Sequence, residues 1–308
     1  MTVSETPSLL SGRQPSWELL ERTLGAIWGL TARQVREELE TRRTPLPLRN
    51  YAESGREVLS PSAIDPYSNP RVLLAELADL EQGGWLEEVA DGLYRLSQRA
   101  SQDIREALTA SDQRLEALEV LPRVELEELA SLLNRLAEAR KSRTTATTRL
   151  MDETRSPIGR IRGSVMALSA QRGDAHRAAW EPLGVSGATW NAFTLIWHGE
   201  ARNAAEVAAL QSWRGYATTD YAAAIHDLVQ RGWLEADQVP GRYRPTMAGA
   251  ALRDEAEERT DESFYRTWSA LTEGEREVLA RHLLVLSTAL REVRRAEREA
   301  GRRSAASL

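Results

Sequence analysis

The chain has 308 residues, of which 42% are hydrophobic and none is cysteine. This length suits about two domains, each with its own core. The lack of cysteine excludes disulfides, cysteine nucleophiles and thiolate metal sites. No apolar run reaches the roughly 18 residues of a membrane span, and residues 1–15 lack the apolar core of a signal peptide. We therefore expect a cytoplasmic globular protein with no membrane segment.

The formal net charge of −6 argues mildly against a nucleic-acid-binding protein, but the charge is unevenly distributed. Basic residues collect in the middle and at the end of the chain: Arg140, Lys141, Arg143, Arg149, Arg155, Arg160, Arg162 and Arg172, then Arg291, Arg294, Arg295, Arg298, Arg302 and Arg303. Charge runs are commonly solvated surface. Whether these arginines bind a polyanion or only face water stays open at this stage.

An internal repeat is the most informative feature of the sequence. Residues 79–87 (DLEQGGWLE) return at 227–235 as DLVQRGWLE. Two shorter matches flank them in the same order, residues 67–70 with 216–219 and residues 92–95 with 241–244. A long-period repeat sets the architecture, and two copies indicate a duplicated domain because a solenoid needs about three.

The first copy is expected over residues 17–139, after a disordered N-terminus at 1–16. Apolar spacing predicts a helix over 17–28, then a short helix that begins after Thr31 as its N-cap. Residues 43–66, rich in proline and serine, form an insertion. Ser68 or Asn69 caps the next helix, with Pro70 at its first position, and Gly83 and Gly84 end it. A hairpin turns at Asp91-Gly92, and helices follow over 101–121 and after Pro122.

The second copy is expected over residues 177–293 and repeats this order. Helices carry Trp190 and Phe193, then Val207 and Leu210, then residues 219–230. A hairpin with Pro240-Gly241 in its turn is followed by helices over 248–260 and 278–293. Between the copies lies a basic linker over 140–176, where Ser156-Pro157 and Gly159 indicate a break. A basic tail over 294–308 ends the chain. The linker is either a strap along DNA or a surface connection.

Helix, short helix, longer helix and hairpin is the order of a winged helix-turn-helix domain. Gly84-Trp85-Leu86-Glu87 with Gly92-Leu93-Tyr94-Arg95, and their counterparts at 232–235 and 241–244, resemble the end of the recognition helix and the wing in MarR-type and PadR-like regulators. Residues 244–249 (RPTMAG) are similar to the motif that begins the helix after the wing, and residues 97–100 (SQRA) match it less well. The predicted fold is mainly α-helical with small hairpin wings and long C-terminal helices in each unit.

The resemblance implies a pseudo-dimer, in which one chain supplies the two DNA-binding units of a homodimer. The N-terminal residues of a recognition helix contact base edges, and the wing contacts phosphates. The implied partner is double-stranded DNA, and further dimerisation stays open. The expected contact residues are Ser68, Asn69, Arg71 and Arg95 in the first unit, and Thr218, Thr219, Tyr221, Arg242 and Arg244 in the second. Acidic residues weaken the case, above all Glu76, Asp79 and Glu81 in the first helix and Asp220 and Asp227 in the second.

Aromatic residues raise the question of a ligand. Trp28, Trp85, Trp197 and Trp233 are expected in the cores, whereas Trp180, Trp190, Trp213 and Trp268 either pack in a core or line a cleft. MarR-type regulators often bind aromatic ligands in such a cleft. No feature identifies the ligand.

An enzyme is not expected. His176, His198, His226 and His282 show no metal-ligand spacing, and neither a phosphate loop nor a nucleophile elbow appears. We expect no cofactor and no metal. Two hypotheses remain: a transcriptional regulator that binds duplex DNA under the control of a small aromatic ligand, and a winged-helix ligand-sensing or protein-interaction module that does not bind DNA.

Overall fold

The computed structural model describes residues 17–48, 59–60, 64–139 and 156–306. The expected disordered N-terminus at 1–16 lies outside these residues, as do most of the insertion and the first part of the linker. The chain divides into two compact units, one formed by residues 1–57, 96–171 and 266–308 and the other by residues 58–95 and 172–265. This division differs from the sequential pair that the repeat suggests, because residues 58–95 group with residues 172–265, whereas the helices over 96–139 and 273–306 belong to a separate bundle.

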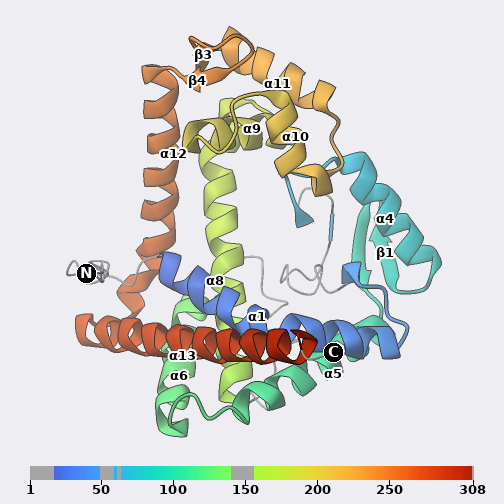
Figure 1. The fold of residues 1–308 in the computed structure, drawn as a ribbon, viewed down its shortest axis with the longest axis vertical. Helices are drawn as coiled ribbons and strands as arrows, with labels where there is room; N and C mark the ends of the chain where they lie inside the picture. Colours follow the sequence, from blue (N-terminus) through green and yellow to red (C-terminus); the bar gives the residue numbers. More distant parts are fainter. Residues whose placement is uncertain (1–16, 49–58, 61–63, 140–155, 307–308) are drawn as a thin grey trace. The chain divides into compact units, whose positions relative to one another are not determined.

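The first unit is a bundle of long helices. It contains α1 (Trp17–Thr41), α5 (Gln98–Glu116), α6 (Arg123–Ala139), the first half of α8 (Pro157–Trp180), the 3-10 helix η3 (Arg266–Ala270) and α13 (Glu273–Ala306). In Figure 1, α1 and α13 lie side by side, and α1 also packs against α5 while α6 packs against α13 and η3. Their buried faces are mostly leucine, as in Leu20, Leu133 and Leu283.

The prediction of two separate helices, one over 17–28 and one beginning after Thr31, is wrong. Helix α1 runs without interruption over Trp17–Thr41. The Thr31 hydroxyl donates to the Ile27 carbonyl one turn back at 2.9 Å, and the Thr23 hydroxyl makes the equivalent bond to the Leu19 carbonyl at 2.8 Å. A threonine inside a helix can make this i−4 bond in place of an N-cap bond. The described part of the first copy therefore has one long helix where two were expected.

The second unit holds short helices that are followed by an antiparallel hairpin and a long helix. It is formed by the second half of α8, α9 (Gly187–His198), α10 (Ala204–Leu210), η2 (Ser212–Arg214), α11 (Thr218–Gln230), the hairpin β3 (Leu234–Ala236) and β4 (Tyr243–Pro245), and α12 (Met247–Tyr265). The hairpin is antiparallel, with Glu235 opposite Arg244. Helix α9 packs against α11 and β4 around Trp190, Phe193, Tyr221 and Leu228. The helices predicted around Trp190 and Val207 and over 219–230 are confirmed.

The same unit contains α4 (Pro70–Gln82) and the hairpin of β1 (Leu86–Ala90) and β2 (Leu93–Leu96). Asn69 caps α4 through its side-chain oxygen, which accepts from the Arg71 amide at 3.1 Å, and Pro70 takes the first helical position as predicted. Leu59, from the insertion, makes a two-bond bridge to Tyr94 and so widens this wing.

The repeated segments form matching elements. Helices α4 and α11 have 13 residues each, and α5 and α12 have 19 each. Gly84 and Gly232, at the turn from helix to strand, both have positive φ, 71° and 73°. Ser97 caps α5, and Thr246 accepts from the Gly249 amide at 2.9 Å in the first turn of α12. The weaker of the two sequence matches therefore has the same local structure as the stronger one.

The C-terminal part of the predicted linker is a helix. Gly159 donates its amide to the Ser156 hydroxyl at 3.3 Å, and Pro157 is the first residue of α8. The break predicted at Ser156-Pro157 is therefore the beginning of a helix. The predicted tail is helical as well, because α13 continues to Ala306.

Candidate nucleic-acid interface

Helices α10 and α11 and the turn between them form the helix-turn-helix. Asn203 caps α10 by accepting from the Glu206 amide at 2.9 Å, and Glu206 in turn accepts from the Arg202 amide, which closes a reciprocal cap. Gly215, at φ 74°, ends the short η2 helix and redirects the chain into α11. Buried Val207 anchors α10 in the core. These local bonds fix where α11 begins.

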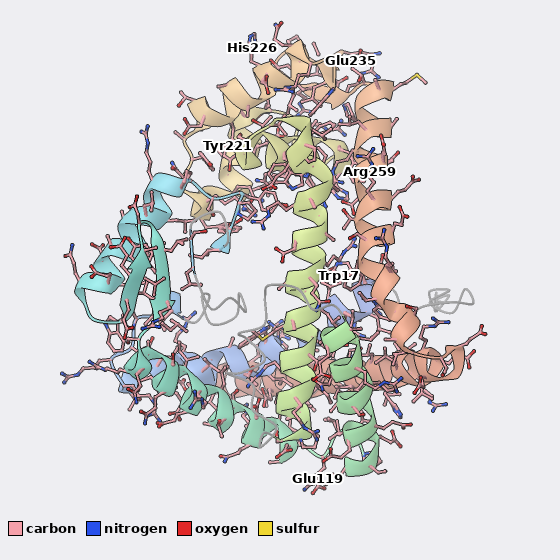
Figure 2. All side chains as sticks on the ribbon, turned by 180° about the vertical axis from the view of Figure 1, so that it is seen from behind. Trp17, Glu119, Tyr221, His226, Glu235 and Arg259 are labelled. Carbon is pink, nitrogen blue, oxygen red and sulfur yellow. The ribbon has the colours of Figure 1, made fainter. Side chains whose placement is uncertain are left out.

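The outward face of α11 has small or uncharged side chains. Tyr221, Ala224, Ile225 and Leu228 are buried, and the opposite side of the helix exposes Thr219, Ala222, Ala223, His226 and Gln230. These five lie within a narrow arc because each residue turns the helix by about 100°. Figure 2 labels His226 on α11, and its side chain is exposed. A recognition face with small residues allows close approach to a groove.

Both acidic residues of α11 have partners within the protein. The Asp220 carboxylate accepts from the Ala217 amide at 2.7 Å and completes the cap of the helix. Asp227 pairs with Arg231 at 2.9 Å. The two carboxylates lie at the edge of the outward face, which reduces the repulsion of phosphate expected from the sequence.

The wing that follows α11 carries one paired and one unpaired arginine. Arg244 lies opposite Glu235 and forms an ion pair with it at 2.8 Å, with both side chains about half exposed. Arg242 is exposed, and no ion pair involves its side chain among the residues that the structure describes. Arg242 is therefore the stronger candidate for a phosphate contact.

Two of the predicted contact residues have buried side chains. Tyr221 is fully buried, and its ring packs edge-on against Tyr216 with centroids 5.7 Å apart. Ser68 is 9% exposed and donates its hydroxyl to Asp65 at 2.6 Å. Thr218 and Thr219 are exposed at the beginning of α11. Of the nine predicted residues, six are therefore exposed: Thr218, Thr219, Arg242 and Arg244 in α11 and its wing, and Arg71 and Arg95 in α4 and its wing.

The N-terminus of α4 is docked onto the turn that precedes α11. The Asn69 amide donates to the Arg214 carbonyl at 2.8 Å, and its side-chain nitrogen donates to the Gly215 carbonyl at 3.0 Å. Arg214 forms a two-bond ion pair with Asp65 at 2.8 Å, and the Tyr216 hydroxyl donates to the Ser68 carbonyl. This end of α4 is therefore anchored to the turn before α11, although the side chains of Pro70, Arg71 and Val72 stay exposed.

The two helix N-termini are too close for two half-sites. Gly215 and Thr218 are three positions apart in the sequence, so the N-termini of α4 and α11 are at most about 25 Å apart along the connecting backbone. Half-sites one turn of DNA apart need contacts about 34–36 Å apart. The implied pseudo-dimer, if each of its two recognition helices bound one such half-site, does not fit this geometry.

The exposed side of α4 differs from that of α11 in charge. Arg71 and Ala75 are exposed, but so are Asp79 and Glu81, for which no ion pair is found within the described ranges. In its wing, Arg95 forms an ion pair with Glu87 at 2.8 Å. Of the two helices, α11 therefore has the surface better suited to duplex DNA.

The tryptophans considered for a ligand cleft are mostly core residues. Trp180, Trp190 and Trp268 are 3%, 1% and 0% exposed, and only Trp213 is open, at 66%. Trp180 and Trp190 stack with ring centroids 6.0 Å apart, whereas Trp268 belongs to the other unit. These residues do not line a common aromatic cleft.

A buried polar cluster lies beside Trp190 in the second unit. The Trp190 indole donates to His176 Nε2 at 3.1 Å, and the Arg253 guanidinium, 3% exposed, lies between the rings of Trp190 and Trp197 at 5.0 and 4.8 Å. Burial lowers the pKa of His176 to about 4, and Arg253 acts in the same direction while Glu257 opposes it. The neutral imidazole can accept from the indole, so this cluster is a packed structural element.

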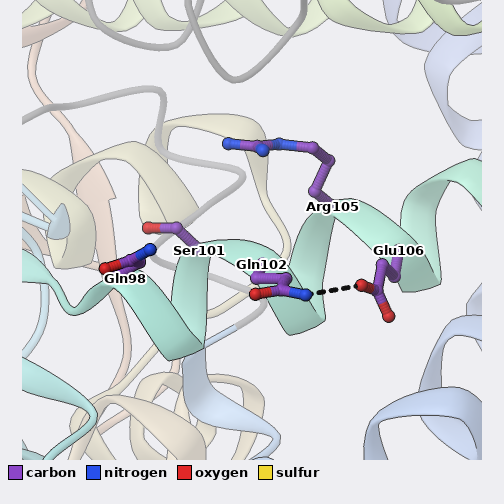
Figure 3. A pocket seen from close by; sticks show the side chains of 5 residues that line it. All are labelled: Gln98, Ser101, Gln102, Arg105 and Glu106. Carbon is purple, nitrogen blue, oxygen red and sulfur yellow. Dashed lines mark hydrogen bonds between the residues drawn. The ribbon is translucent and has the colours of Figure 1, made fainter.

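A shallow hollow of about 390 Å³ lies on one side of α5. It is lined by five polar side chains of this helix, shown in Figure 3: Gln98, Ser101, Gln102, Arg105 and Glu106. Gln102 donates to Glu106 at 3.0 Å. Because no aromatic residue lines this hollow, it does not match the expected aromatic-ligand site.

The arginines of α8 are used inside the protein. Arg162 is fully buried, pairs with Asp112 and donates to the Ser111 hydroxyl at 2.7 Å. Arg160 pairs with Glu127, and Arg172 pairs with Asp261 at 2.6 Å. From residue 157 onward, these ion pairs leave Arg160, Arg162 and Arg172 poorly suited to the strap along DNA, one of the two alternatives that the sequence left open.

Neither a metal site nor a membrane-spanning helix is found among the described residues. In the described part of the chain, no group of three or more histidine, aspartate or glutamate side chains could hold a metal ion. No helix among the described residues has both the length and the apolar character needed to cross a membrane.

Comparison with known proteins gives one match. A model of a helix-turn-helix family matches residues 75–296. No curated protein and no solved structure matches the chain. The matched range includes most of α4, both wings, the complete α10–α11 unit and much of α13.

Proposed function

The chain belongs to a helix-turn-helix family, and from this premise we propose that it is a cytosolic transcriptional regulator that binds duplex DNA through α11 and its wing. The observation that carries the proposal is the outward face of α11. It combines threonines at the helix N-terminus with Ala222, Ala223, His226 and Gln230, and its two acids are held by other groups.

This face suits the major groove. The groove is about 12 Å wide and admits an α-helix, and small residues such as Ala222 and Ala223 let the helix backbone approach the bases. Gln230 and His226 supply hydrogen-bonding groups, and glutamine can bond an adenine edge with two bonds. Thr218 and Thr219 are placed to contact phosphate near the helix N-terminus.

Arg242 in the wing supplies a phosphate contact beside the groove. It is exposed and has no carboxylate partner in the described structure, whereas Arg244 shares its charge with Glu235. Because affinity for DNA arises mainly from neutralised phosphates, we assign Arg242 a larger share of the binding than Arg244.

We further propose that residues 17–139 and 177–293 arose by duplication and that only the second copy reads DNA. The equal lengths of α4 and α11 and the shared caps after both wings support the duplication. The hydrogen bonds of Asn69 to the Arg214 and Gly215 carbonyls support the different roles of the two copies, because they hold α4 against the turn before α11. In this account, Ser68 and Asn69 position α11, and Arg71 and Arg95 lie outside the principal DNA contact.

A protein-interaction module without DNA binding is the second candidate. One observation favours it: Trp213 and Leu210 are 66% and 48% exposed at the turn of the helix-turn-helix. Exposed large apolar side chains close together are typical of docking surfaces.

Binding of the purified protein to fluorescent duplexes tests the proposal. One duplex carries the region upstream of the protein's own gene, another has random sequence, and each is measured at low and moderate salt. We expect tight binding to the first that weakens as salt rises and that random DNA competes for poorly. Absence of binding to either duplex at low salt would overturn the proposed function and favour the interaction module.

A further inference from the structure

The exposed face of α13 carries a row of four arginines. Arg291, Arg295, Arg298 and Arg302 follow one another at spacings of four, three and four residues. At about 100° per residue, these spacings place all four within about 60° of one another around the helix, and at about 1.5 Å per residue the row is about 16 Å long. We call these four residues the arginine row.

All four side chains are exposed and most of their charge is free. Arg298 and Arg302 form no ion pair within the described ranges. Arg295 approaches Glu299 only to 3.9 Å, and Glu299 is also shared with Arg303 at 3.8 Å. Arg291 donates to the Ser287 carbonyl one turn back, a bond that leaves its charge uncompensated.

The row is distinct from the face by which α13 packs. Leu283, Leu286 and Leu290 are fully buried on the side of the helix that contacts α1 and α6. Arg294, between two members of the row, lies close to Gly29 of α1, and Glu297 pairs with Arg114 of α5 at 2.7 Å. The bundle therefore holds α13 in place without using the arginine row.

Phosphate on duplex nucleic acid fits the row better than a lipid surface does. Arginine binds phosphate oxygens through two parallel hydrogen bonds. Helices that bind at a membrane interface combine basic residues with exposed tryptophan, phenylalanine or leucine. Beyond Val285, the described part of α13 exposes no large hydrophobic side chain.

We propose that the arginine row is a second DNA contact, which binds backbone phosphates of the duplex without regard to sequence. It rests on the proposed DNA binding and adds to it a site in the helical bundle, separate from α11. The row supplies affinity and salt dependence, while α11 supplies discrimination between sequences.

The test compares the variant R291Q/R295Q/R298Q/R302Q with a control of equal charge change, R33Q/R36Q/R105Q/R123Q, whose arginines are exposed elsewhere in the same unit. Duplex affinity is measured over a range of salt concentrations for the upstream and random duplexes. Four phosphate contacts correspond to a slope of log affinity against log salt of about 3.6, so we expect the row variant to lose about 3 of the wild-type slope and the control to lose less than 1. The ratio of affinities for the two duplexes should stay within about twofold.

A lysine variant, R291K/R295K/R298K/R302K, separates charge from helix stability, and we expect it to keep most of the slope. Equal slopes for the row variant and the control would overturn the inference while leaving α11 as the DNA contact. Failure of the wild-type protein to bind any duplex would instead overturn the proposed function, and the row with it. Row-dependent binding to vesicles containing phosphatidylserine, with an unchanged duplex slope, would also overturn it and assign the row to lipid.

Discussion

Gly249, the last residue of the segment 244–249, occupies a position that has no room for a side chain. A Cβ atom there would lie 2.1 Å from the Trp233 carbonyl oxygen, so the first turn of α12 can touch the strand after α11 only without a side chain. Thr246 holds the same contact by donating its hydroxyl to the Gly232 carbonyl at 2.7 Å. The threonine and the glycine of the segment 244–249 thus act together to join wing and helix.

Gly249→Ala should destabilise the protein by about 2 kcal/mol or more, because a backbone carbonyl cannot move aside as a flexible side chain can. Chemical denaturation measures this change. Gly274→Ala is the control, since nothing lies within 4 Å of its Cβ position and alanine favours a helix by up to about 1 kcal/mol. Equal stability of the two variants would contradict the proposed contact.

His176 should make the protein less stable in mild acid. The unfolded histidine binds a proton near pH 6.5, whereas burial lowers the pKa of the folded residue to about 4. The unfolded state therefore holds more protons between these values, and the free energy of unfolding falls as the pH drops from 6.5 to 4, by at most about 3 kcal/mol.

Denaturant titrations across this pH range check the effect. His176→Gln should reduce the pH dependence, whereas His198→Gln, at an exposed position, should leave it as in the wild type. A wild-type slope retained in His176→Gln would refute the assignment.

At the scale of elements, α4 and α11 have the same length and share two buried positions, but their surroundings differ. Leu77 and Leu80 of α4 take the places of Ile225 and Leu228 of α11 when the two helices are aligned from their first residues. Both acids of α11 have partners, whereas Asp79 and Glu81 of α4 form no ion pair within the described ranges. A shared fold does not by itself imply a shared function, which depends on the exposed residues.

Glu235→Gln should strengthen DNA binding. The substitution removes the carboxylate that pairs with Arg244 and frees the guanidinium for phosphate. We expect higher affinity at low salt and a salt slope larger by about 1. The matched control is Glu87→Gln, which frees Arg95 in the other wing and should have no effect. Equal gains from the two substitutions would argue that both wings contact DNA.

The sequence predicted most elements of the second copy because caps, periodicity and turns agree there. The predicted helix boundaries were wrong at residues whose type is compatible with more than one position in a helix. Thr31 has the chemistry of an N-cap but lies inside α1, where packing against α13 and α5 extends the helix. Pro157 was read as a break, although Ser156-Pro157 begins a helix in the same way as Asn69-Pro70.

The exposed surface of α11 and its wing was predicted only in part. Thr218, Thr219 and Arg242 followed from position in the motif and are exposed, whereas the exposed residues Ala222, Ala223 and His226 were not among the predicted contacts. The spacing of Tyr221, Ile225 and Leu228 could have indicated them, because the exposed face lies opposite the apolar one. The docking of Asn69 on Gly215 spans 146 residues and has no local signal in the sequence.

At the scale of the whole molecule, arginines divide between structure and surface. Those of α8 are paired inside, as with Arg162 and Asp112, whereas those at the end of α13 face solvent. A net charge of −6 therefore conceals an exposed basic row. Composition alone could not separate the paired arginines of α8 from the exposed arginines of α13, because it does not show which side chains have partners.

Arg162→Met should destabilise the protein by about 3–5 kcal/mol, because it leaves the Asp112 carboxylate buried without its partner. The double variant R162M/D112L should lose less than Arg162→Met alone. The control Arg33→Gln, which breaks an exposed ion pair with Glu37, should change stability by less than about 1 kcal/mol. A folded Arg162→Met with normal stability and weakened DNA binding would restore the strap hypothesis.

The most direct test of the central claim is the DNA affinity of Ala223→Glu compared with that of Ala75→Glu. The two alanines are equivalent exposed positions of α11 and α4, and each substitution adds one negative charge. If α11 alone enters the groove, Ala223→Glu should weaken binding to the upstream duplex by about 100-fold or more, and Ala75→Glu should stay within about threefold of the wild type. Equal losses would contradict the claim that only the second copy reads DNA, and no loss in either would remove both helices from the interface.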